Sequence, residues 1–162
     1  MTMKTLKIEL KWALIFIASL LLWMLLERIT GLHDEYIHLH QYVTLLYAIV
    51  AILIYVLALK DKRKNGYAGS ASYSQLFKSG LIMTLIITAL SPLTQYIVSE
   101  EITPDYFNNV VAYSVESGYF ESMEQAEAEF NLENYIITST VWALVMGIAT
   151  TAIVSIFLQK KK

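Results

Sequence analysis

Four long apolar stretches, separated by shorter polar segments, dominate the chain. They lie at about 10–28, 42–59, 76–98 and 135–158. Each approaches the ~20 residues that a helix needs to cross the hydrocarbon core of a bilayer. The apolar positions are continuous rather than alternating, which favours helices over barrel strands. The pattern predicts an all-α, polytopic membrane protein with four transmembrane helices in a single membrane domain, 1–162.

The first stretch also has the basic start and apolar run of a signal peptide. Its uncharged apolar run ends at Leu26, and the sequence ERIT at 27–30 offers no small-residue cleavage site. We therefore expect an uncleaved first span.

Two polar segments separate the later spans. The segment at 60–75 opens with the basic run KDKRK and continues through a small, flexible GSAS stretch at 69–72. We interpret its basic residues as a topology signal. The segment at 99–134 carries nine acidic residues and no Lys or Arg. It predicts two short amphipathic helices, one capped by Thr103 before Pro104 and stopped by Gly118, the other capped by Ser122.

The distribution of charged residues along the chain is more informative than the net charge. The net charge is −2, with 56% hydrophobic residues, 16% charged residues and a mean hydropathy of +0.50. The four spans place 11 of the 12 basic residues on the side of the termini, giving about +9 there and −11 on the other side. The positive-inside rule then predicts a bacterial inner (cytoplasmic) membrane protein with both termini cytoplasmic. The 11 residues are Lys4, Lys7, Lys11, Lys60, Lys62, Arg63, Lys64, Lys78, Lys160, Lys161 and Lys162.

All three histidines fall within eight residues of the first outer loop. Histidine and carboxylate side chains are suitable ligands for zinc or similar divalent ions. If the segment is helical, Glu35 and His38 share one face. The candidate metal ligands are His33, Glu35, His38 and His40, and Asp34 is a further candidate ligand or supporting group. Sensing of external pH and ordinary interfacial hydrogen bonding remain open alternatives.

The last two spans carry patterns of helix packing. Small residues recur every four positions in the fourth span: Ser139, Ala143, Gly147, Thr151 and Ser155. We expect this stripe to pack against another helix, within the chain or between copies, with lining of a substrate path as the alternative. In the third span, Pro92 removes a backbone donor and predicts a kink.

The sequence contains no motif typical of catalysis or of nucleic-acid binding. The absence of cysteine excludes disulfides, thiolate nucleophiles and cysteine-based metal sites. No nucleophile elbow, phosphate loop or dinucleotide fingerprint is present. The few basic residues beside the membrane do not form a nucleic-acid surface. We therefore expect no enzyme; the expected partners are the lipid bilayer and a second copy or another membrane protein.

Short motifs in a fixed order resemble one known family. They are GLHD at 31–34, IHLH at 37–40, ALKDK at 58–62, SPLTQY at 91–96, ITPDYF at 102–107 and FN at 130–131, with Gly147 in the last span. This order is similar to that of the domain of unknown function 4199 family (DUF4199), small four-span membrane proteins of Bacteroidota. The resemblance implies an integral inner-membrane protein without an assigned activity, so no catalytic residue can be transferred.

The sequence thus favours a non-enzymatic structural or interaction module of the membrane. A first alternative is an extracytoplasmic metal-binding or pH-sensing protein that uses the histidines at 33–40. A second is a subunit of a small oligomeric transporter or channel, with a path along Thr84, Thr88, Gln95 and Thr151.

Overall fold

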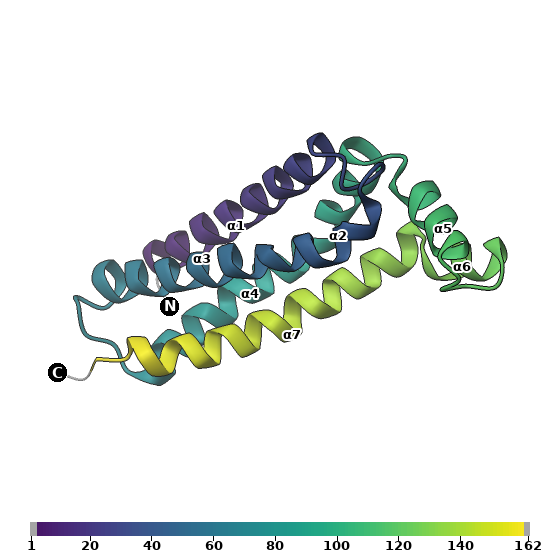
Figure 1. The fold of residues 1–162 in the computed structure, drawn as a ribbon. Helices are drawn as coiled ribbons and strands as arrows, with labels where there is room; N and C mark the ends of the chain where they lie inside the picture. Colours follow the sequence, from purple (N-terminus) through teal and green to yellow (C-terminus); the bar gives the residue numbers. More distant parts are fainter. Residues whose placement is uncertain (1–2, 161–162) are drawn as a thin grey trace. The chain divides into compact units, whose positions relative to one another are not determined.

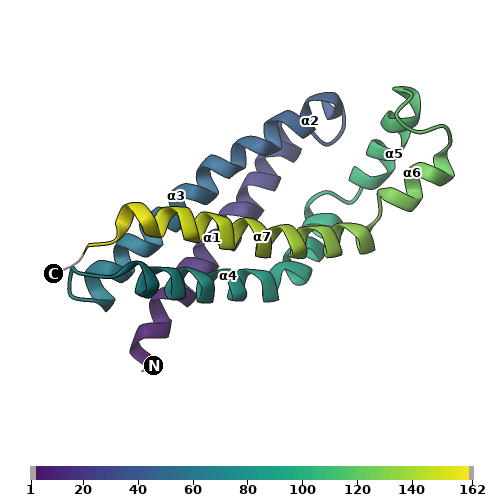
Figure 2. The ribbon, with the colours of Figure 1, turned by 90° about the horizontal axis from the view of Figure 1, so that it is seen from below.

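The computed structural model describes residues 3–160, and within this range it is all-helical, with 83% helix and no strand. Figures 1 and 2 show the helices in chain order. Lys161 and Lys162 of the basic set lie outside the described residues. The elements are α1 (Met3–Ile29), α2 (Ile37–Val43), η1 (Thr44–Leu46), α3 (Tyr47–Asp61), η2 (Lys62–Gly66), α4 (Tyr73–Tyr96), η3 (Ile97–Ile102), α5 (Tyr106–Glu116), α6 (Met123–Glu129) and α7 (Leu132–Leu158).

Four helical segments of the described chain are long and apolar enough to cross a membrane. They are Leu6–Ile29, Ile37–Gly66, Tyr73–Ile102 and Leu132–Leu158. Large apolar side chains such as Leu45, Ile29 and Phe157 are exposed to 68%, 72% and 80%. Exposed apolar surface on this scale indicates a lipid environment. The predicted fold class, a helical protein with four apolar spans, is confirmed.

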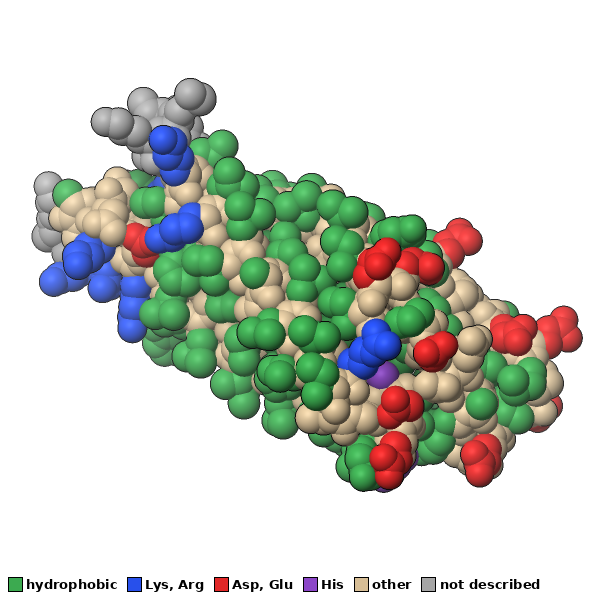
Figure 3. Space-filling view, turned by 90° about the horizontal axis from the view of Figure 1, so that it is seen from above, with side chains coloured by type: hydrophobic (Ala, Val, Ile, Leu, Met, Phe, Trp, Pro, Cys, Tyr) green, Lys and Arg blue, Asp and Glu red, His purple; other side chains and the backbone are tan. Residues whose placement is uncertain are grey.

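The chain divides into two compact units. Unit 1 comprises the described parts of Met1–Ala18, Ala48–Leu90 and Thr140–Lys162; unit 2 comprises Ser19–Tyr47 and Ser91–Ser139. Twelve of the 14 acidic residues belong to unit 2, whereas its one basic residue is Arg28. In Figure 3, acidic side chains gather over one part of the surface, basic side chains over another, and hydrophobic side chains cover much of the remainder.

Two residues of the small-residue stripe of α7, Gly147 and Thr151, pack against α4 in unit 1. A Cβ atom added to Gly147 would lie 2.5 Å from Thr84 Cγ2, and one added to Gly80 would lie 2.4 Å from Thr151 Cγ2. Each glycine therefore accommodates a threonine of the other helix. Thr84 and Thr151, two residues of the candidate transport path, are fully buried in this contact. At Gly147 and Thr151 the stripe is therefore closely packed inside the fold.

A buried ion pair in unit 1 differs from the sequence expectation. From the sequence, Lys62 was interpreted only as part of a basic topology signal. Instead, Lys62 Nζ lies 2.6 Å from Glu9 Oε1, both side chains are 1% exposed, and Ser79 Oγ donates to the same oxygen at 2.7 Å. Burying an unpaired charge costs several kcal/mol. The opposite charges of Lys62 and Glu9 offset this cost for each other, which explains why both are buried.

The segment that follows Lys62 is also more ordered than its composition suggests. Ala71 is buried, and its backbone exchanges two hydrogen bonds with Lys160, at 2.8 and 3.0 Å. Arg63 Nη1 donates to the Leu158 carbonyl at 2.8 Å. The predicted flexible stretch at 69–72 is thus held against the end of α7 by backbone pairing.

In unit 2, α5 packs against α6 and α2. Gly118 ends α5 as predicted, with φ +75 and the Tyr119 N–H donating back to Ser114 O at 2.8 Å. Ser122 caps α6 by accepting from Gln125 N–H, also as predicted. Thr103 does not cap α5: the N-cap is Asp105, and the Thr103 hydroxyl donates instead to the Val98 carbonyl, because the preceding helix continues through η3.

Pro92 lies inside α4, which remains helical from Tyr73 to Tyr96. The kink stays a prediction.

Candidate metal centre

The centre of unit 2 is a buried carboxylate, Glu27, in the last turns of α1. Its side chain is 2% exposed. Oε1 accepts a hydrogen bond from the indole N–H of Trp23, one turn earlier on the same helix. This contact fixes the carboxylate and leaves Oε2 directed toward the segment that follows the helix.

Gly31 turns that segment back toward Glu27. Its φ of +79 is a left-handed conformation that glycine adopts without steric cost. Leu32 N–H donates to the Glu27 carbonyl and Gly31 N–H to the Arg28 carbonyl, both at 3.0 Å, which closes the helix end. The glycine thereby brings the next residues of the loop beside the carboxylate.

His33 is the first histidine brought there. It is 3% exposed, and its Nε2 lies 3.1 Å from Glu27 Oε2. Asn109 of α5 donates to the His33 carbonyl at 2.9 Å and so holds the loop backbone in place. Within the described chain, His33 Nδ1 is buried without a hydrogen-bond partner.

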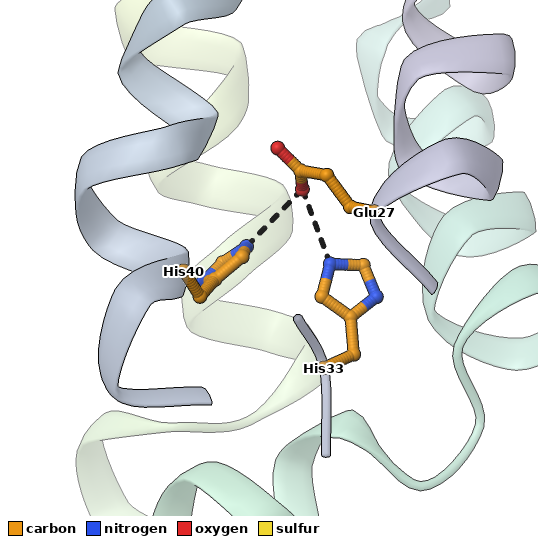
Figure 4. Close-up of side chains that lie close together, drawn as sticks. All are labelled: Glu27, His33 and His40. Carbon is orange, nitrogen blue, oxygen red and sulfur yellow. Dashed lines mark hydrogen bonds and ion pairs between the residues drawn. The ribbon is translucent and has the colours of Figure 1, made fainter. Parts of the chain in front are cut away.

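His40 approaches the same oxygen from α2. Its Nε2 lies 3.3 Å from Glu27 Oε2, although this nitrogen makes no hydrogen bond to any described group. Its other ring nitrogen, Nδ1, lies 3.2 Å from the Tyr106 hydroxyl, which lies 3.2 Å from the Tyr135 hydroxyl. Figure 4 shows both imidazoles converging on one oxygen of Glu27.

The three side chains form the group of potential metal ligands found among the described residues. One ligand atom from each of Glu27, His33 and His40 lies within 4.8 Å of the others. Zinc binds nitrogen and carboxylate oxygen at ~2.0–2.2 Å, so two ligands at a tetrahedral angle are about 3.3 Å apart. The two observed nitrogen–oxygen separations, 3.1 and 3.3 Å, agree with that value. The separation of the two imidazole nitrogens is within 4.8 Å.

The structure brings together only part of the predicted ligand set. His33 and His40 converge, whereas Glu35, His38 and Asp34 are exposed and do not join them. The one-turn spacing of Glu35 and His38 does not apply because α2 begins only at Ile37. The carboxylate comes from Glu27 instead.

Sequence reasoning missed both Glu27 and Tyr106. Glu27 was counted as the first polar residue after a span, yet a lone acidic residue at the end of an apolar run, six positions before a histidine, was a usable signal. Tyr106 is 66 positions from His40, and no local pattern joins the two.

Electrostatics favour a cation at this position. A buried carboxylate is costly unless its charge is compensated. Within the described part of the chain, the ion-pair partners of Glu27 are the two imidazoles, which carry charge only when protonated. Burial, together with the neighbouring Tyr135 and Glu27, raises the pKa of the Tyr106 phenol. Its hydroxyl therefore stays neutral and can hydrogen-bond to His40.

Two cavities within unit 2 flank the cluster. One, of about 260 Å³, is lined by His33 together with Asp34 and Asp105. The other, of about 480 Å³, is lined by His40 together with Tyr106 and Tyr135. Arg28 also lines the smaller cavity, so its two carboxylates are offset in part by one guanidinium.

The chain matches a known protein family over most of its length. Residues 11–160 match the family described as "Protein of unknown function (DUF4199)". No curated protein and no solved structure matches the chain.

Proposed function

The chain belongs to the DUF4199 family, and we propose that it is a non-enzymatic membrane module that binds a divalent transition-metal ion of the zinc type through Glu27, His33 and His40. The observation that carries the proposal is the convergence of two imidazole nitrogens on one buried carboxylate oxygen. Two nitrogens and one oxygen leave a fourth position of a tetrahedral ion open.

The hydrogen bonds around the cluster support ligation. When the Nδ1–H of His40 donates to the Tyr106 hydroxyl, Nε2 carries the lone pair that a metal requires. That lone pair faces the lone pairs of Glu27 Oε2 at 3.3 Å. A shared cation converts this repulsive contact into an attractive one.

The proposal extends to location and partners. We place the protein in the bacterial inner membrane with both termini cytoplasmic, because nearly all basic residues lie in unit 1 and nearly all acidic residues in unit 2. The metal site then lies on the extracytoplasmic side. Association with a second copy or another membrane protein would not use Gly147 or Thr151, which are buried against α4.

The test is calorimetric titration of zinc into protein purified without a polyhistidine tag. We expect one ion per chain, and at least about tenfold weaker binding for His33→Gln and for His40→Gln. His38→Gln is the matched control, since it makes the same change at an exposed histidine outside the cluster. Binding weaker than about millimolar in the wild type, or equal losses in all three variants, would overturn the proposal.

A further inference from the structure

The larger cavity of unit 2 borders the Glu27 cluster and shares His40 and Tyr106 with it. It has a volume of about 480 Å³, within the usual range of small-molecule sites. Its walls come from α2, α5, the start of α7 and the connections around α6. Five of its lining residues are aromatic: Tyr106, Tyr113, Tyr119, Phe130 and Tyr135.

Besides the aromatic rings, the lining contains hydroxyl groups, the amide of Gln41 and the imidazoles of His38 and His40. Ser114, Ser117 and Thr44 supply hydroxyls, and none of the lining residues within the described chain is Asp, Glu, Lys or Arg. A metal ion would lack carboxylates here. A quaternary ammonium has no N–H donors, so it needs no carboxylate or carbonyl partner in this lining.

The acidic residues around the cavity favour a positively charged ligand. Most of the lining residues come from the segment at 99–134, which contains nine acidic residues and no basic one. This field disfavours an anion and concentrates cations at the mouth of the cavity. Aromatic faces attract a cation through the ring quadrupole, most strongly when it is desolvated.

We propose that this cavity binds an organic cation with a trimethylammonium head, held by the aromatic residues of α5 and the α6–α7 connection. The same head occurs in free choline and in the phosphatidylcholine headgroup. The cavity shares His40 and Tyr106 with the Glu27 cluster, whereas Tyr113, Tyr119 and Phe130 take no part in that cluster. The test of this proposal therefore uses protein without zinc and substitutions at Tyr113 and Ser117.

The experiment measures binding of radiolabelled choline to EDTA-treated protein in nanodiscs of phosphatidylethanolamine and phosphatidylglycerol, which lack the trimethylammonium group. We expect saturable binding of one choline per chain. The neutral carbon isostere of choline, with a tert-butyl group in place of trimethylammonium, should compete about tenfold more weakly. Absence of saturable binding, or equal competition by the isostere, would overturn the proposal.

Paired variants locate the site. Tyr113→Leu removes a ring and should weaken binding about tenfold, whereas Tyr113→Phe keeps the ring and should leave it unchanged. Ser117→Trp places a large side chain in the lining, while Ala112→Trp makes a similar change at an exposed position of α5 outside the cavity. Loss of binding only in Ser117→Trp supports the site; equal effects of the two tryptophans would contradict it.

A final competition experiment distinguishes a lipid headgroup from a soluble cation as the ligand. Stronger competition by a soluble short-chain phosphatidylcholine assigns the site to a lipid headgroup, and stronger competition by free choline assigns it to a soluble cation. Zinc titration of the same samples separates this proposal from the metal centre, because either site can fail while the other binds.

Discussion

Glu27 Oε2 lies 3.1 Å from His33 Nε2, although the two residues stand at the end of a long apolar helix and in the turn that leaves it. The turn at Gly31 makes this contact, and His40 adds a second imidazole from α2. The resulting cluster leads to three of the five predictions that follow.

Zinc should stabilise the wild type but not Glu27→Gln. A ligand present at one hundred times its Kd stabilises the folded state by about 2.7 kcal/mol, and the neutral amide removes the charge that holds the ion. Thermal unfolding in detergent, with and without zinc, measures the difference. Glu35→Gln is the control, and equal zinc stabilisation of both variants would contradict the role of Glu27.

Tyr106→Phe should weaken zinc binding about 10–100-fold without abolishing it. The substitution removes the hydroxyl that hydrogen-bonds to His40 Nδ1, and groups supporting a metal ligand have effects of this size. Calorimetric titration measures the change. Tyr42→Phe, at an exposed tyrosine of α2, is the matched control; identical affinities for the two variants would exclude the supporting contact.

Zinc affinity should fall as the pH is lowered from about 8 to about 5. Metal and proton compete for the same imidazole nitrogens, so binding must release protons and weaken in acid. Titrations in buffers of different ionisation enthalpy count the protons released. His38→Gln should retain the wild-type pH dependence, and a flat affinity profile would contradict imidazole ligation.

Gly147→Leu should destabilise the fold by about 1–3 kcal/mol or more through overpacking. A single added Cβ would already lie 2.5 Å from Thr84 Cγ2 and 2.8 Å from the Tyr55 hydroxyl. Unfolding by denaturant in mixed micelles measures the loss. Ala149→Leu, on the exposed side of α7, should have little effect.

The same contact can be tested by rescue. Thr84→Ala removes the nearest obstructing methyl group, so Thr84→Ala combined with Gly147→Ala should cost less than the sum of the two single changes. Additive losses would show that the pair does not interact.

Removing one partner of the Glu9–Lys62 pair should cost about 3–5 kcal/mol, because it leaves an uncompensated buried charge. Glu9→Gln and Lys62→Met are the single variants. The double variant should be markedly more stable than the sum of the single losses implies, as a double-mutant cycle of unfolding free energies would show. Additivity within about 0.5 kcal/mol would mean that the two side chains are not coupled.

Some elements could be predicted because their signals are local. Gly118 ends α5 and Ser122 caps α6 because each acts on backbone groups within a few positions. The predicted cap at Thr103 is wrong for a nonlocal reason: the helix before it continues through η3, so the Thr103 hydroxyl already serves the Val98 carbonyl.

The members of the metal cluster could not be predicted from local sequence signals alone. The sequence indicates a histidine-rich loop, and helical spacing draws attention to Glu35 and His38. The chain instead turns at Gly31 and starts α2 at Ile37, which places His33 and His40 on the two sides of Glu27. Contributions from Trp23, Asn109 and Tyr106 depend on how α1, the loop and α5 pack.

The sequence by itself determined the four apolar helices and the separation of basic from acidic residues, because hydrophobic length and charge are properties of the residues in order. Tertiary structure decided which polar groups are buried and with whom. From the sequence, Lys62 is an ordinary basic loop residue, but the fold buries it beside Glu9. In the same way, the fold places Glu27 between two imidazoles. Burial and pairing arise from residues distant in the chain, so no local pattern contains them.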